Sequence, residues 1–307
     1  MYIYDLLEQG IRLNASDIHI TVGTNPVARV KGGFVKLSEQ ILTSEVTMQI
    51  PTFEKLGLPE SIKSFTEKHK GLVLVTGPTG SGKSTTLASM INIINEKQQK
   101  HIITLEDPIE YVHHHKQSLV NQREVGTDTE SFHSALRAIL RQDPDVILIG
   151  EMRDPETVSI ALTAAETGHL VFSTLHTVGA AKTIDRIVDM FQPSQQQQIK
   201  TQLSTVCEGV VSQQLLPTAD GKGRIAAIEL MFATPAIKNL IREGKTYQIP
   251  NMIQTGVKVG MKTMDQDLME LYKNGKITKD MALSRCTDQE FMTRMIGGVN
   301  YNGYYNR

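Results

Sequence analysis

The sequence predicts an α/β protein with a mostly parallel sheet, preceded by a small α+β domain and followed by a helical lobe. From residue 71 onward, short aliphatic and β-branched runs alternate with longer segments of helical apolar spacing, the pattern of buried parallel strands joined by helices. The four runs are LVLVTG, HIITLED, DVILIG and HLVFSTLH. A polar stretch over residues 51–70, broken by Pro and Gly, separates them from the N-terminal pattern.

The N-terminal pattern predicts a helix followed by a small antiparallel sheet. Apolar residues keep helical spacing through Leu13, alternate from Ile18 to Val22, and form two short runs around Gly32 and Gly33. The segment LTSEVTMQI that follows also has a helical character.

Three parts of the chain follow from these patterns. We assign residues 1–66 to the N-terminal α+β domain and its linker, residues 67–296 to the α/β core with its helical lobe, and residues 297–307 to a tail. The tail is rich in Gly, Asn and Tyr without periodicity, so we expect it to be flexible.

Helices are predicted between and after the strand runs of the core. In DPETVSIALTAAETG, Asp154 can cap a helix and Gly168 can end it. After residue 190 we expect mostly helix, including the whole of SQQQQIKTQLSTVCEGVVSQQLL and a shorter helix opened by Thr234 and closed by Gly244.

Composition narrows the class of protein. With 40% hydrophobic and 21% charged residues the chain is typical of a soluble globular protein. The balance of 32 basic against 33 acidic residues argues against nucleic-acid binding as the main function, as do the 5% aromatic residues and the absence of tryptophan. Cys207 and Cys286 have no paired spacing, which indicates a reducing, cytoplasmic protein without a zinc ribbon. No apolar stretch approaches the roughly 20 residues of a membrane span, so we expect membrane contact only through partners.

The most informative motif is GPTGSGKST, which matches the phosphate-binding pattern G-x-x-x-x-G-K-[ST] from Gly77 to Ser84. An apolar strand leads into it and an amphipathic segment leaves it, so backbone N–H groups and a helix N-terminus would face the same anion. We expect Lys83 to reach the β and γ phosphates and the Ser84 hydroxyl to hold Mg²⁺. The residues expected to contact the nucleotide are Pro78, Thr79, Gly80, Ser81, Gly82, Lys83, Ser84 and Thr85.

Hydrolysis also needs groups that hold the metal and orient water, and these should follow neighbouring parallel strands. Glu151, at the end of DVILIG, is the candidate for water-mediated Mg²⁺ contact or water activation. Glu110, after HIITLEDPI, is the competing base, and the sequence does not separate the two roles.

Histidines bracket the last strand run. His176, at its far end, is the candidate γ-phosphate sensor, whereas His169 fits a hydrogen-bonded structural role equally well. The trio 113–115 is better explained as a polar turn than as a metal site, because three consecutive side chains cannot all face one ion on regular backbone.

Together these motifs resemble the secretion ATPases of type II secretion and type IV pilus systems. The resemblance runs from Gly71 to about Ile296 and includes GPTGSGKSTT, TLEDPIEYV, ILIGEMRD and TAAETGHLVFSTLHT, with ASDIHI similar to the family's N-terminal domain. AIKNLIRE resembles the AIRNLIRE signature of the pilus-retraction branch, with Lys238 in place of Arg.

The resemblance implies a RecA-like P-loop NTPase core, a PAS-like N-terminal domain, and ATP and Mg²⁺ as ligands. It further implies a homo-hexameric ring at the cytoplasmic face of the inner membrane, acting on a pilus inner-membrane platform protein to drive retraction and twitching motility. Assembly ATPases of the superfamily commonly carry a paired-cysteine motif that this chain lacks, which favours retraction. The alternatives are an extension or type II secretion ATPase and a catalytically impaired nucleotide-binding ring subunit.

One departure from the family concerns the N-terminal domain. In the family this domain continues through further strands that carry phosphate-contacting arginines, but here no arginine occurs between Arg29 and Arg123. Arginine fingers neutralise charge that grows in the transition state. We therefore expect a shortened N-terminal domain and weak ATPase activity unless Arg12, Arg29 or Arg137 substitutes.

Overall fold

The computed structural model describes residues 3–13, 15, 17–19, 25–30, 33–38 and 50–301. The chain forms two compact units, one of residues 1–51 with 110–112 and one of the remaining residues. In the small unit, helix α1 (Ile3–Arg12) precedes an antiparallel sheet in the order β1 (Asp17–His19), β2 (Val27–Val30), β3 (Gly33–Lys36). The predicted helix and antiparallel sheet are therefore present.

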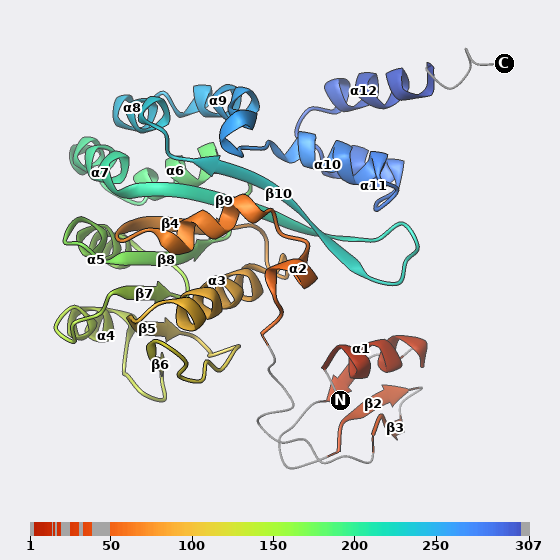
Figure 1. Ribbon diagram of the computed structural model, residues 1–307, viewed down its shortest axis with the longest axis horizontal. Coiled ribbons are helices and arrows are strands. Elements are labelled where there is room, and N and C mark those ends of the chain that lie inside the picture. The colour runs from red at the N-terminus through yellow and green to blue at the C-terminus, as the bar shows by residue number, and fades with distance from the viewer. Residues whose placement is uncertain are drawn as a thin grey trace. The chain divides into compact units, whose positions relative to one another are not determined.

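A seven-stranded sheet runs through the large unit (Figure 1) in the order β10-β9-β4-β8-β7-β5-β6. All neighbours are parallel except β10 and β9, which form an antiparallel hairpin. The strands are β4 (Gly71–Thr76), β5 (His101–Glu106), β6 (Leu119–Glu124), β7 (Val146–Ile149), β8 (Leu170–Leu175), β9 (Cys207–Pro217) and β10 (Arg224–Phe232). The four predicted runs are β4, β5, β7 and β8, which confirms the α/β class.

Helices cover both faces of this sheet (Figure 1), and alternation along each strand divides the core between the faces. On β4, Leu72 and Leu74 pack into one buried cluster while Val73 and Val75 pack into the other. The longer helices are α3 (Lys83–Lys97), α4 (Phe132–Ile139), α5 (Pro155–Glu166), α6 (Ala180–Asp189), α7 (Pro193–Val206), α8 (Pro235–Glu243), α10 (Met264–Lys273) and α12 (Gln289–Tyr301). The shorter ones are α2 (Phe53–Leu56), η1 (Glu60–Glu67), η2 (Thr246–Gln248), α9 (Ile249–Thr255), η3 (Gly256–Val259) and α11 (Lys279–Arg285).

Helix ends follow the predicted capping residues. Asp154 accepts a hydrogen bond from the Thr157 amide at the start of α5, and Thr234 caps α8 in the same way. Gly244 ends α8 in the left-handed conformation. None of the helices in the described ranges is long and apolar enough to cross a membrane.

The segment 52–66 packs with the large unit, although the sequence pattern groups it with the N-terminal domain. Phe53, Ile62 and Phe65 are almost fully buried in the cluster that α3 and the sheet share. At the other end, α12 extends through Tyr301, while 302–307 and most of LTSEVTMQI lie outside the described residues.

The prediction of continuous helix over residues 194–216 is wrong beyond Val206. There α7 ends and β9 begins, pairing in parallel with β4 and antiparallel with β10. A Cβ on Gly209 would lie 2.2 Å from Phe65 Cζ and 2.5 Å from the Met231 carbonyl oxygen, so only glycine allows this close approach. Long-range pairing of the sheet thus overrides the local apolar spacing.

Candidate nucleotide-binding site

The glycine-rich loop joins the end of β4 to the start of α3 and depends on left-handed backbone. Gly77, Gly80 and Gly82 have φ of 145°, 76° and 87°. A Cβ on Gly77 would lie 2.2 Å from the Gln213 carbonyl oxygen, so the loop can curl against β9 only with glycine there.

The N-terminus of α3 faces this loop without an anion of its own. Its N-cap, Gly82, provides no side-chain hydrogen bond, and its first turn contains no acidic residue. The Ser81 hydroxyl is buried without a hydrogen-bond partner. An uncapped positive helix end beside an unsatisfied hydroxyl fits a bound phosphate.

Lys83, the first residue of α3, is largely buried and turns back over the loop. Its Nζ donates to the carbonyl oxygens of Gly77 at 3.0 Å and Pro78 at 3.1 Å, and it lies 3.5 Å from His176 Nδ1. The ammonium group is therefore held where the phosphates of a nucleotide in this loop would lie.

Glu151 and His176 follow the adjacent strands β7 and β8 and contact each other. His176 Nε2 lies 3.1 Å from one Glu151 oxygen, and Arg153 donates to the other at 2.8 Å. His176 therefore lies between the two groups, with Nδ1 toward the Lys83 ammonium and Nε2 toward the Glu151 carboxylate.

Opposing influences set the pKa of Glu151. Burial raises it, but the hydrogen bond and charge of Arg153 and the contact with His176 outweigh burial, and the pKa lies below its ordinary value. Glu151 is thus an anion near neutral pH, suited to holding a metal-bound water.

The backbone that carries these groups is tied together across the two strands. The Thr174 hydroxyl donates to the Gly150 carbonyl oxygen at 2.6 Å, and the Met152 amide donates to the Thr174 carbonyl oxygen at 3.1 Å. The loop after β7 is therefore fixed directly to β8.

Three further predictions concern Glu110, His169 and the histidines 113–115. Glu110 is exposed and groups by its contacts with the small unit, so its role as a competing base stays a prediction. His169 bonds to the Ala164 carbonyl oxygen at 2.9 Å before β8, a structural role. His113 is buried, and burial lowers its pKa to about 4. Among the described residues no group of three or more His, Cys, Asp or Glu side chains is placed to hold a metal ion, and the polar-turn interpretation of 113–115 stays a prediction.

Gln213 is a site residue that sequence analysis missed. This buried side chain on β9 donates to the Ser81 carbonyl oxygen at 2.6 Å and accepts from the Thr86 hydroxyl at 3.0 Å, clamping the loop to α3. Its segment was expected to be helical, which gave no reason to place it beside the loop.

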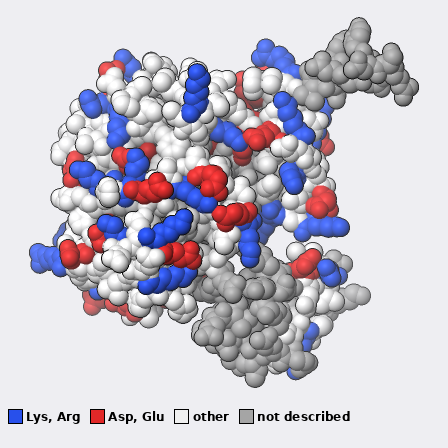
Figure 2. Space-filling view, in the orientation of Figure 1, with Lys and Arg blue, Asp and Glu red and all other residues white. Residues whose placement is uncertain are grey.

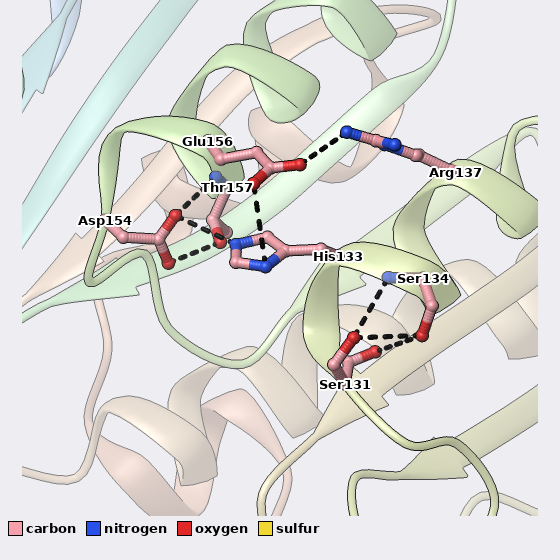
Figure 3. A network of polar contacts seen from close by, with 7 residues as sticks. All are labelled: Ser131, His133, Ser134, Arg137, Asp154, Glu156 and Thr157. Carbon is pink, nitrogen blue, oxygen red and sulfur yellow. Dashed lines mark hydrogen bonds and ion pairs between the residues drawn. The ribbon is translucent and has the colours of Figure 1, made fainter.

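The three arginines expected as substitutes each contact their own unit. Arg137 donates to Glu156 at 2.6 Å within a network that joins α4 to α5 (Figure 3). In that network His133 Nε2 bonds to Asp154 at 3.0 Å. Arg12 pairs with Glu8 at 3.2 Å, and the guanidinium of Arg29 stacks over the ring of Phe34 at 4.4 Å.

The loop, its lysine and the acidic strand end define a P-loop NTPase with a RecA-like core. More particularly, the chain belongs to the family of type II/IV secretion system proteins, which it matches over residues 8–283.

Similar proteins include a twitching motility protein of Neisseria gonorrhoeae, 56% identical over 242 residues, which are 79% of this chain and 65% of the relative. The type IV pilus retractation ATPase PilT of Pseudomonas aeruginosa is 43% identical over 335 residues, 92% of this chain and 97% of the relative. A crystal structure of the pilus retraction motor PilT with bound ADP has a TM-score of 0.79 at 43% identity and covers 96% of this chain and 99% of that one. The chain thus spans just under two thirds of the first relative and nearly all of the second.

Proposed function

We propose that this chain is an ATP-hydrolysing motor that works as a homo-hexameric ring and drives type IV pilus retraction. The observation that carries the proposal is the contact chain Lys83–His176–Glu151 beside the loop, in a fold shared with PilT over nearly the whole length. The ring acts at the cytoplasmic face of the inner membrane on a platform protein of the pilus machine.

In this proposal the loop amides and Lys83 bind the triphosphate, and His176 contacts the γ-phosphate. Ser84 and Glu151 would hold Mg²⁺, the latter through water, and the ion would supply charge neutralisation. Because the pKa of Glu151 is low, its carboxylate orients water rather than donating a proton.

The test measures ATP hydrolysis and oligomer mass together, with and without nucleotide. Lys83→Ala abolishes magnesium-dependent ATP affinity, whereas Lys279→Ala, an exposed lysine on α11, changes neither quantity. If Lys83→Ala binds and hydrolyses ATP like the parent, the motor proposal is wrong.

Two further variants separate the candidate bases. Glu151→Gln and Glu110→Gln are compared by turnover at saturating ATP and by nucleotide affinity, and the base is the residue whose loss lowers turnover by about 10²–10⁴-fold with affinity retained.

A second candidate function is a catalytically impaired subunit that joins a ring and modulates active copies. The alignment with PilT runs over 335 residues, more than the 307 of this chain, so it skips part of the relative. In this alternative, the skipped part includes the strands of the N-terminal domain that carry its arginines. Single-turnover hydrolysis decides: an impaired subunit binds ATP but forms no ADP, and a competent one loses turnover when Arg12, Arg29 or Arg137 is replaced by alanine.

Retraction and extension are separated by the phenotype of a deletion strain. Loss of a retraction motor leaves pili present but static, and loss of an extension or secretion motor leaves none. A deletion strain without pili would contradict retraction.

A further inference from the structure

Glu229 on β10 caps a helix that has no side-chain cap of its own. Helix α6 begins after Gly179, which offers no capping oxygen. Glu229 Oε1 accepts from the Ala180 amide at 2.7 Å, and Ser212 Oγ on β9 accepts from the Gly179 amide at 2.8 Å. Ser212 stands opposite Glu229 in the strand register, so one cross-strand pair receives two consecutive amides.

Glu229 and Ser212 hold the start of α6, which directly follows the segment that carries His176, called here the His176 segment. Residues 176–179 connect β8 to α6, and no further element intervenes. At one end of the segment the His176 ring lies between Lys83 and Glu151, and at the other end Gly179 and Ala180 are bound to the hairpin. The imidazole position is therefore fixed partly by the β9–β10 hairpin.

The second oxygen of Glu229 reaches a different helix. Oε2 accepts from the Met264 amide at 3.4 Å, in the first turn of α10. In the described ranges no ion pair between Glu229 and a lysine or arginine is found, and its two oxygens accept from amides at the positive ends of two helices. Burial raises the pKa of Glu229, the Ala180 and Met264 amides counteract part of this, and Asp265 adds to the rise.

We propose that Glu229 is a positioning residue for ATP hydrolysis. By fixing the N-terminus of α6 it keeps the His176 imidazole between Lys83 and Glu151, and through Met264 it ties that segment to the C-terminal helices. The inference rests on the proposed function, because it assigns Glu229 a part in that reaction.

The test is a double-mutant cycle between Glu229 and His176 in the full chain. Glu229→Ala lowers kcat by about 10- to 100-fold, the scale of a small misplacement of a catalytic group, with KM nearly unchanged. In a His176→Ala background the same change lowers kcat by less than about twofold, because the group that Glu229 positions is already gone. Glu229→Gln, which still presents an oxygen to Ala180, recovers most of the activity.

Asp267→Asn is the matched control. Asp267 Oδ2 accepts from the Ile228 amide at 2.7 Å, so it also joins β10 to α10, but none of its hydrogen bonds goes to the His176 segment. If Glu229 were only structural, both variants would lose activity in proportion to lost thermal stability, and the losses would be independent of His176. That result overturns the inference.

Amide hydrogen exchange tests the role of Glu229 without a measurement of ATP hydrolysis. In Glu229→Ala the Gly179 and Ala180 amides exchange faster than in the parent, and in Asp267→Asn they do not. Unchanged exchange in Glu229→Ala overturns the inference even if the parent does not hydrolyse ATP. A parent without turnover whose exchange responds as expected refutes the proposed function alone.

Discussion

Replacement of Gln213 by alanine tests whether β9 stabilises the phosphate loop in its nucleotide-binding conformation. The change removes the donor to the Ser81 carbonyl oxygen and the acceptor of the Thr86 hydroxyl, whose distances to Gln213 are 2.6 and 3.0 Å. Gln213, Ser81 and Thr86 are each 2% exposed, so water cannot replace the lost bonds without rearrangement.

The expected magnitude follows from the two partners left unsatisfied. Each costs about 1–3 kcal/mol, or about 2–6 kcal/mol of unfolding free energy in total. Domains of about 150–250 residues lose roughly 2–4 °C per kcal/mol and larger ones somewhat less, so the unfolding midpoint falls by several degrees, on the order of 4 °C. Nucleotide affinity also falls, because the loop is no longer held in its binding conformation.

The assay combines thermal unfolding with titration of a fluorescent ATP analogue. Gln202→Ala is the control, since this glutamine on α7 bonds to Glu166 at 3.0 Å near the surface and its loss changes stability by less than about 0.5 kcal/mol. If Gln213→Ala keeps the parent's unfolding midpoint and nucleotide affinity, the two hydrogen bonds of Gln213 do not hold the loop, and the prediction is wrong.

Three further predictions concern single groups. Arg153→Gln removes a hydrogen bond and a charge that lower the pKa of Glu151, so that pKa rises and the acid limb of the kcat/KM profile moves to higher pH; an unmoved limb would count against Glu151 as the titrating group. Burial raises the pKa of Cys207 to about 12, so a thiol reagent at pH 8 modifies Cys286 in the native protein and Cys207 only after unfolding; rapid double modification would contradict this. Asp154→Ala removes the cap of α5 and lowers the unfolding free energy by about 1 kcal/mol at neutral pH in denaturant titrations. Since the pKa of Asp154 lies below its ordinary value of 3.8, that stabilisation is present above 3.8 and is lost as pH falls through the lower folded-state value; a loss that grows in acid would refute the assignment.

Much of the fold was predictable because its signals are local. The central strands are short and apolar, and the helix ends carry capping residues such as Asp154 and Thr234. The phosphate loop was predictable for the same reason, since the glycines and Lys83 that shape it are adjacent in sequence. Glu151 and His176 could be proposed from their places after strand runs, and the structure puts them in contact.

Other features depend on pairing between distant segments and leave no local pattern. Helix α7 ends at Val206, but its helical apolar spacing continues into β9. Only the pairing of β9 with β4 and β10 decides its conformation. Gln213 and Glu229 belong to the β9–β10 hairpin, so the sequence did not predict the contact of Gln213 with the loop or that of Glu229 with α6. The edge strand β6 was missed because its sequence, LVNQRE, is polar and half exposed.

Charged side chains of both signs are interspersed over the face of the large unit seen in Figure 2. No single-sign field dominates that view, which agrees with the balanced composition of the sequence.

The position of β4 has a consequence for how the protein is made. β4 ends at Thr76, but its two neighbours in the sheet end only at Leu175 and Pro217. A nascent chain on the ribosome therefore carries an unpaired inner strand until most of its length has been synthesised. We expect a chain interrupted between Leu175 and Cys207 to expose one edge of β4, which makes it a target for chaperones and proteases.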